Sequence, residues 1–96
     1  MKTFAVEYSY DITRTHEMDA LRPQHRAFLR GLLEAGILLA SGPWVDGAAP
    51  GALLLVRAEN RDGVLRLLDD DPFHRAHVIS HRSARAWDPT IGPFAS

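Results

Sequence analysis

The chain has 96 residues and a mass of 10.7 kDa, which is the size of a single domain. It lacks cysteine, which excludes disulfides, thiolate metal ligands and a cysteine nucleophile and leaves packing or self-association to stabilise the fold. Its formal charge of −1, from 11 basic and 12 acidic residues, disfavours both a nucleic-acid partner and binding to anionic lipid.

The apolar runs and the first residues of the sequence indicate where in the cell the protein is expected. No run approaches the ~20 apolar residues that a helix needs to span a bilayer. The first seven residues lack the long apolar stretch and the small-residue cleavage site of a secretion signal. We therefore expect a soluble, cytoplasmic protein without a membrane partner.

The first predicted element is a strand over residues 3–10. Apolar side chains occupy every second position from Phe4 to Tyr10, which is typical of a strand with one buried face. Residues 11–20 show no sustained period and predict a loop with at most a short helical turn.

A helix is predicted from about residue 20 or 22 to residue 35. Pro23 suits its first turn, and Gly36 is a natural stop. Its apolar stripe consists of Leu21, Phe28, Leu29, Leu32 and Leu33.

The second half of the chain predicts two strands, a helix and a last strand. The strands at 37–44 and 52–58 flank a loop rich in turn formers and should form a hairpin. Asn60 is a plausible N-cap for a helix that ends by residues 69–71, because Pro72 disfavours helical geometry before it. A strand over 78–87 completes the pattern.

The order β-α-β-β-α-β predicts a ferredoxin-like α+β fold, an antiparallel four-stranded sheet with two helices on one face. Residues 37–40 and 53–56 are apolar at successive positions, and strict alternation would put Leu38 and Ala40 together on one face. Both faces of the sheet are then apolar. We expect the open face to pack against a second copy of the chain in a homodimer.

His25 is the most informative candidate for chemistry, because a titratable ring sits on the apolar stripe of the first helix. One interpretation is a core histidine whose ring N–H meets a carbonyl. The other is a general acid or base held near neutral pH by partial burial and a neighbour.

Asp71 is the second candidate, and its pattern also has two interpretations. An aspartate before Pro72 is a normal N-cap for a short turn, with Asp69 and Asp70 on the solvated surface. Alternatively, Asp71 pairs with His25, fixes the tautomer of its ring and raises its basicity. The spacing leaves both open.

The remaining candidates carry weaker signals. His74, His77 and His81 suggest a metal site, but a predicted strand spans the last of them and no supporting ligand set is nearby, so we predict no metal. His16 lies in polar surroundings and is expected to be solvated. Trp44 and Trp87 are expected to pack in the core or at an interface.

Ser41 and Gly42 end the second predicted strand. The serine hydroxyl could donate to a ligand and the glycine could let a backbone amide approach it, although turn chemistry explains both residues equally well. No nucleophile elbow, phosphate loop or dinucleotide fingerprint is present, and we predict no cofactor.

Three motifs in order resemble the YCII-related (YciI-like) domain family: Arg-Pro-x-His at 22–25, Gly-x-Leu-x-x-x-Gly-Pro at 36–43 and Asp-Pro-Phe at 71–73. The resemblance implies one domain over residues 1–89, with 90–96 as a C-terminal tail, and a dimeric α+β barrel. It also implies that His25 and Asp71 match the family's characteristic pair, which lines a cleft.

Two functional hypotheses follow. The first is a cofactor-independent enzyme of proton-transfer type, a lyase, isomerase or dehalogenating eliminase acting on an unknown small molecule. In it His25 moves the proton, Asp71 orients the ring, and Ser41 or the Gly42 amide holds a developing oxyanion. The second is a non-catalytic dimer that binds a small ligand or assists another enzyme.

Overall fold

A computed structural model describes residues 1–95; Ser96, the end of the predicted tail, lies outside the described residues. The elements are β1 (Lys2–Tyr10), a 3-10 turn η1 (Ile12–Arg14), α1 (Thr15–Glu34), β2 (Leu38–Pro43), β3 (Gly51–Ala58), α2 (Arg61–Leu68), α3 (Pro72–Arg75) and β4 (Ile79–Trp87). None of the helices in residues 1–95 is both long and apolar enough to cross a membrane.

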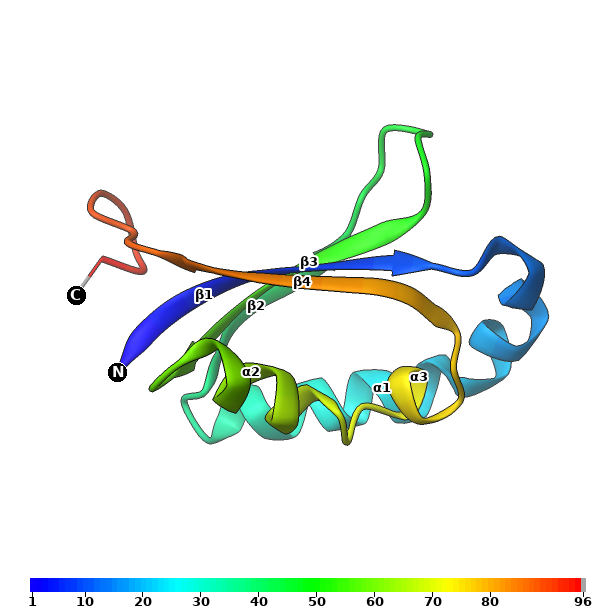
Figure 1. The fold of residues 1–96 in the computed structure, drawn as a ribbon, viewed down its shortest axis with the longest axis horizontal. Helices are drawn as coiled ribbons and strands as arrows, with labels where there is room; N and C mark the ends of the chain where they lie inside the picture. Colours follow the sequence, from blue (N-terminus) through cyan, green and yellow to red (C-terminus); the bar gives the residue numbers. More distant parts are fainter. Residues whose placement is uncertain (96) are drawn as a thin grey trace.

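The four strands form one antiparallel sheet in the order β2-β3-β1-β4, and the helices cover one of its faces (Figure 1). This is the predicted ferredoxin-like α+β fold, including the β2–β3 hairpin. The core lies between the sheet and the helices, where the alternation of β1 and β3 buries one side of each strand. Its fully or almost fully buried members include Phe4, Val6, Tyr8, Leu54, Val56, Val64 and Leu68.

The start of α1 was predicted wrongly. The helix begins at Thr15, some five residues earlier than expected, because η1 leads directly into it and Asp11 caps η1 by accepting a hydrogen bond from the Thr13 amide at 2.9 Å. Pro23 therefore lies inside the helix and not in its first turn. It faces solvent, so it disturbs no core packing, although the helix loses one backbone hydrogen bond and the ring crowds the carbonyl one turn earlier.

The early start of α1 adds Met18 to the core. Its side chain is buried with Phe73 and Val78 in a small second cluster under the N-terminal half of the helix. Phe73 belongs to α3, so this cluster fixes α3 against α1.

Strict alternation in β2 was also predicted wrongly. The register with β3 shifts between Leu38 and Ala40, which is a β-bulge at Leu39. Leu38 pairs with Val56, which faces the helices, whereas Ala40 pairs with Leu55 on the opposite face. The bulge then brings Ser41, the partner of Leu54, back to the helix side of the sheet.

Candidate functional site

Asp71 is the centre of a buried polar network. It lies between α2 and α3 and is completely buried. As the N-cap of α3 it accepts a hydrogen bond from the Phe73 amide at 2.9 Å, followed by Pro72 in the first helical position. The N-cap interpretation is therefore confirmed, and it explains how the backbone fixes this carboxylate.

The same carboxylate contacts His25. The ring nitrogen Nδ1 lies 2.8 Å from Oδ1 and 3.0 Å from Oδ2, and the histidine is only 8% exposed. The imidazole also stacks on the Phe73 ring, with centroids 3.9 Å apart and an angle of 6° between the planes. Asp71 thus both caps α3 and contacts His25, because capping α3 places the carboxylate and Phe73 against one histidine of α1.

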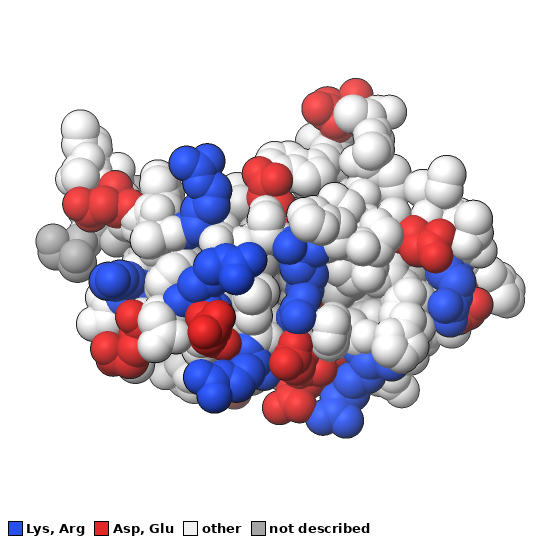
Figure 2. All heavy atoms as spheres, in the orientation of Figure 1, with Lys and Arg blue, Asp and Glu red and all other residues white. Residues whose placement is uncertain are grey.

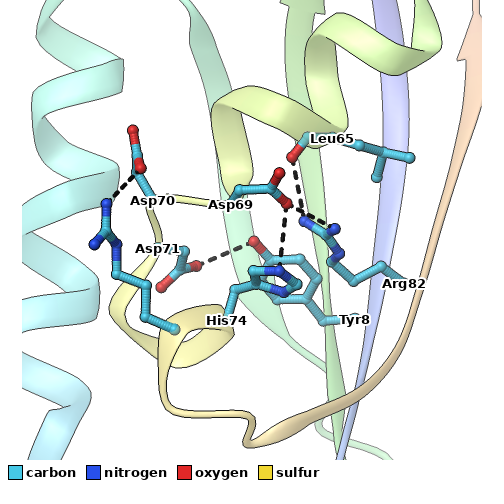
Figure 3. A network of polar contacts seen from close by, with 8 residues as sticks. Tyr8, Leu65, Asp69, Asp70, Asp71, His74 and Arg82 are labelled. Carbon is cyan, nitrogen blue, oxygen red and sulfur yellow. Dashed lines mark hydrogen bonds and ion pairs between the residues drawn. The ribbon is translucent and has the colours of Figure 1, made fainter.

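Tyr8 is a third member of the network that the sequence pattern did not indicate. From the middle of β1 its hydroxyl donates to Oδ2 of Asp71 at 3.0 Å (Figure 3). Burial, and then the negative charge of Asp71, raises the pKa of Tyr8 far above its usual value, so the phenol stays a neutral donor. The one available signal was that a tyrosine on the buried side of a strand needs a partner for its hydroxyl.

These contacts fix the tautomer of His25. A carboxylate only accepts hydrogen bonds, so Nδ1 carries the proton that it donates to Asp71, and in the neutral ring Nε2 is the nitrogen with the lone pair. Nε2 has no protein partner, yet within residues 1–95 no buried side-chain nitrogen or oxygen is left unpaired. Nε2 is therefore open to solvent, and His25 lines a cavity.

This cavity has a volume of about 490 Å³ and lies between α1 and the edge strand β2. Phe73 and Tyr10 line it beside His25, and burial, together with the charge of Asp71, raises the pKa of Tyr10 to about 12. The size suits a small molecule, and the walls are largely apolar. His25 thus lines a cavity of ligand size.

Ser41 and Gly42 line the same cavity from β2. The Trp44 amide donates to the Gly51 carbonyl at 3.1 Å, and hydrogen-bonded pairs recur at every second position of an antiparallel ladder. Gly42, opposite Leu53, therefore directs its amide toward β3, while Ser41 presents its hydroxyl on the cavity side. Of the two predicted ligand-binding residues, the structure makes Ser41 the better placed donor.

The other four histidines do not form a cluster in the described residues. His74 contacts Asp69 at 3.3 Å, and Asp69 also accepts from Arg82 at 2.8 Å, so Asp69 joins a surface ion-pair network (Figure 3). His16, His77 and His81 are exposed. Nowhere in residues 1–95 do three His, Asp or Glu side chains come close enough together to hold a metal ion.

Neither tryptophan is buried. Trp44 is 46% exposed and Trp87 is 45% exposed, so packing in the core of a single chain does not account for either of them. An interface role for both stays a prediction.

Fold and site together define a ferredoxin-like domain with a tyrosine-supported His–Asp pair beside a cavity. The sequence profile of the YCII-related domain matches residues 3–88, and the chain belongs to that family. No curated protein matches the chain in sequence.

A solved structure with a similar fold is 5-chloro-2-hydroxyhydroquinone dehydrochlorinase from Burkholderia phenoliruptrix AC1100, in complex with 2,5-dihydroxybenzoquinone. The TM-score is 0.78 with 19% sequence identity, covering 98% of this chain and 99% of that one. At this identity the likeness concerns the fold.

Proposed function

We propose that the protein is a cofactor-independent enzyme of proton-transfer type, a lyase, isomerase or dehalogenating eliminase. The observation that carries the proposal is the free Nε2 of His25, which faces the cavity while Nδ1 is held by a buried carboxylate. The similar fold of a dehydrochlorinase, whose name describes loss of hydrogen chloride, supports this class of reaction.

In the proposed reaction Nε2 removes a proton from a substrate carbon or hydroxyl next to a carbonyl. The electron pair of the broken bond forms a new double bond; in an elimination the leaving group departs with its own bonding pair, and in an isomerisation the imidazolium returns the proton at another carbon. Asp71 stabilises the imidazolium. The Ser41 hydroxyl donates to the oxygen on which negative charge develops.

The first prediction concerns His25→Asn. The asparagine amide nitrogen takes the approximate place of Nδ1 and keeps a donor to Asp71, whereas the atom corresponding to Nε2 is gone. We expect turnover to fall by about 10²- to 10⁴-fold, the usual contribution of a positioned general base. Thermal stability should fall moderately, because the stacking on Phe73 is lost.

The assay follows chlorinated hydroxyhydroquinones and related carbonyl compounds by proton NMR, recording product, chloride release and deuterium incorporation. His16→Asn, an exposed histidine of the same helix, is the matched control. Unchanged turnover in His25→Asn would overturn the role of His25 as the base. No turnover of these compounds by the wild type would count against the enzyme proposal and favour the alternative, a non-catalytic ligand-binding or accessory domain.

We also propose that the chain forms a homodimer through the open sheet face, as a single-domain protein of the cytoplasm. Leu53 and Leu55 point away from the helices, because Leu54 and Val56 between and beside them face the core. The β2–β3 connection rises on that same side of the sheet (Figure 1), with Val45 92% exposed. Charged residues such as Glu7 and Arg85 share this face, so the apolar part lies at β3. This apolar part suits a second copy of the same sheet.

The second prediction is that light scattering at micromolar concentration gives about twice the chain mass of 10.7 kDa. Leu53→Lys is expected to give the monomer mass: the lysine can pair with Glu7, its cross-strand neighbour, but would be costly to bury between two sheets. Ile12→Lys, an exposed apolar residue outside the sheet, is the control. A monomeric wild type would refute the dimer.

A further inference from the structure

A row of arginines follows the wall of the cavity along α1. Arg22, Arg26 and Arg30 recur at every fourth residue, and all three line the cavity. At about 100° per residue they lie roughly 60° to 140° around the helix from His25, on one flank of α1. The helix thus presents His25 and the arginines to the same cavity from neighbouring sides.

In the described part of the chain, only one arginine of this row, Arg22, has a carboxylate partner. Within the described residues, Asp and Glu are absent from the cavity lining. Arg22 pairs with Asp19 at 2.7 Å, but across residues 1–95 neither Arg26 nor Arg30 takes part in an ion pair. By contrast, basic and acidic side chains lie interspersed on the face seen in Figure 2. A row of one sign at a cavity in a chain of net charge −1 calls for an anionic partner.

We propose that Arg26 and Arg30 bind the carboxylate of the substrate, so that the enzyme acts on small organic acids with an apolar body. The guanidinium fork matches a carboxylate in geometry and keeps its charge at every working pH. Leu29 and Phe73 supply apolar walls between the arginines and His25. This inference rests on the proposed function in one respect, the bond of the acid that reacts; the binding of the carboxylate does not depend on it.

The spacing along α1 limits the shape of the acid. At ~1.5 Å per residue, Arg26 lies about 1.5 Å and Arg30 about 7.5 Å further along the helix axis than His25. A molecule whose reacting bond is at Nε2 therefore places its carboxylate several bonds away, toward the C-terminal end of α1. An acid group on a ring or a short chain satisfies this distance.

The test compares benzoate with benzamide, a neutral molecule of nearly the same size and shape, in titrations followed by ¹⁵N-correlated NMR. We expect the wild type to bind benzoate about tenfold more tightly, as a charge-assisted contact predicts. Arg26→Gln/Arg30→Gln should reduce that preference to about threefold or less. Arg66→Gln, at an exposed position of α2 outside the cavity, removes one positive charge elsewhere and should keep the preference.

Three results would overturn the inference: no tighter binding of benzoate in the wild type, a preference that survives in the double variant, or an equal loss in Arg66→Gln. Because the titrations involve no turnover, they separate this inference from the proposed function. Full turnover in His25→Asn with an intact benzoate preference overturns only the catalytic role of His25. Lost turnover in His25→Asn without a benzoate preference in the wild type overturns only the arginine site.

Discussion

Replacing Asp71 by asparagine is expected to lower turnover by about 10²- to 10⁴-fold and the free energy of unfolding by about 1–3 kcal/mol. The carboxylate accepts from three groups, the Tyr8 hydroxyl, the Phe73 amide and Nδ1 of His25. An asparagine offers one acceptor oxygen and two N–H donors in the same buried space. At least one of these contacts must therefore change or be lost.

The contact with His25 decides the effect on catalysis. Nδ1 lies 2.8 Å from Oδ1 and 3.0 Å from Oδ2, so the NH₂ group of an asparagine comes beside Nδ1 in either orientation of the amide. Nδ1 can accept from that group only when the ring moves its proton to Nε2. Nε2 then has no lone pair for a substrate proton. The amide also lacks the charge that stabilises the imidazolium, so tautomer and electrostatics act in the same direction.

Two measurements follow the two effects separately. Long-range ¹H–¹⁵N NMR of the imidazole reports the tautomer of His25 without any substrate, and urea unfolding reports stability. Asp70→Asn is the matched control, because Asp70 is the neighbouring carboxylate and is exposed, with its ion pair to Arg75 on the surface. An unchanged tautomer together with full turnover would contradict the role assigned to Asp71.

The fold was predictable because its local signals agree with its packing. The alternation of residues 3–10 and the apolar run at 52–58 have a single satisfactory arrangement, in which one side of each strand meets a helix stripe. Asn60 accepts from the Gly63 amide at 2.8 Å, as an N-cap should. His25 was recognised for a similar reason, since a polar ring on an apolar stripe conflicts with its surroundings unless it has a partner.

The parts that could not be predicted depend on contacts between distant segments. Asp71 and His25 are 46 residues apart, and an Asp-Pro pair has the same sequence whether or not a histidine reaches the carboxylate. The hydrogen bond from Tyr8 to Asp71 joins residues even further apart in the sequence. The sequence of β1 predicts the same strand whether or not this bond forms. The bulge at Leu39 is a matter of register with β3, which the apolar residues at 37–40 do not encode.

The early start of α1 was hidden for a different reason. Residues 15–20 contribute only Met18 to the core, so the apolar period is too weak there to indicate a helix. Pro23 then resembles a first-turn proline. The helix extends past it because the Asp11 cap and the packing of Met18 on Phe73 stabilise the preceding turns.

Alkaline pH is expected to unfold the protein cooperatively through its two tyrosines. Tyr8 and Tyr10 are the only tyrosines, and Lys2 is the only lysine, so few other groups titrate in this range. Burial, reinforced by the charge of Asp71, raises the pKa of Tyr10 to about 12 and that of Tyr8 in the same direction. The folded state therefore retains protons that the unfolded state releases above about pH 10.

This difference in bound protons means that the free energy of unfolding falls as the pH rises. The stability that the neutral phenols provide is fully present below about pH 10 and is lost as the pH rises, by about 1.4 kcal/mol per pH unit for each tyrosine. For Tyr10 the loss continues to its folded pKa of about 12 and reaches at most about 3 kcal/mol. Tyr8 adds a loss of the same sign, and two such terms are a large share of the stability of a small domain.

Tyrosinate absorbance and circular dichroism, recorded together from neutral to strongly alkaline pH, test this expectation. Both signals should change in one common transition, because the phenols ionise when the fold opens. Tyr8→Phe should make the loss of stability with pH less steep, although it also leaves Asp71 without one donor. If both tyrosines form tyrosinate near pH 10 while the circular dichroism stays native, the Tyr8–Asp71 contact is open to solvent, and the buried network around His25 would then be wrong.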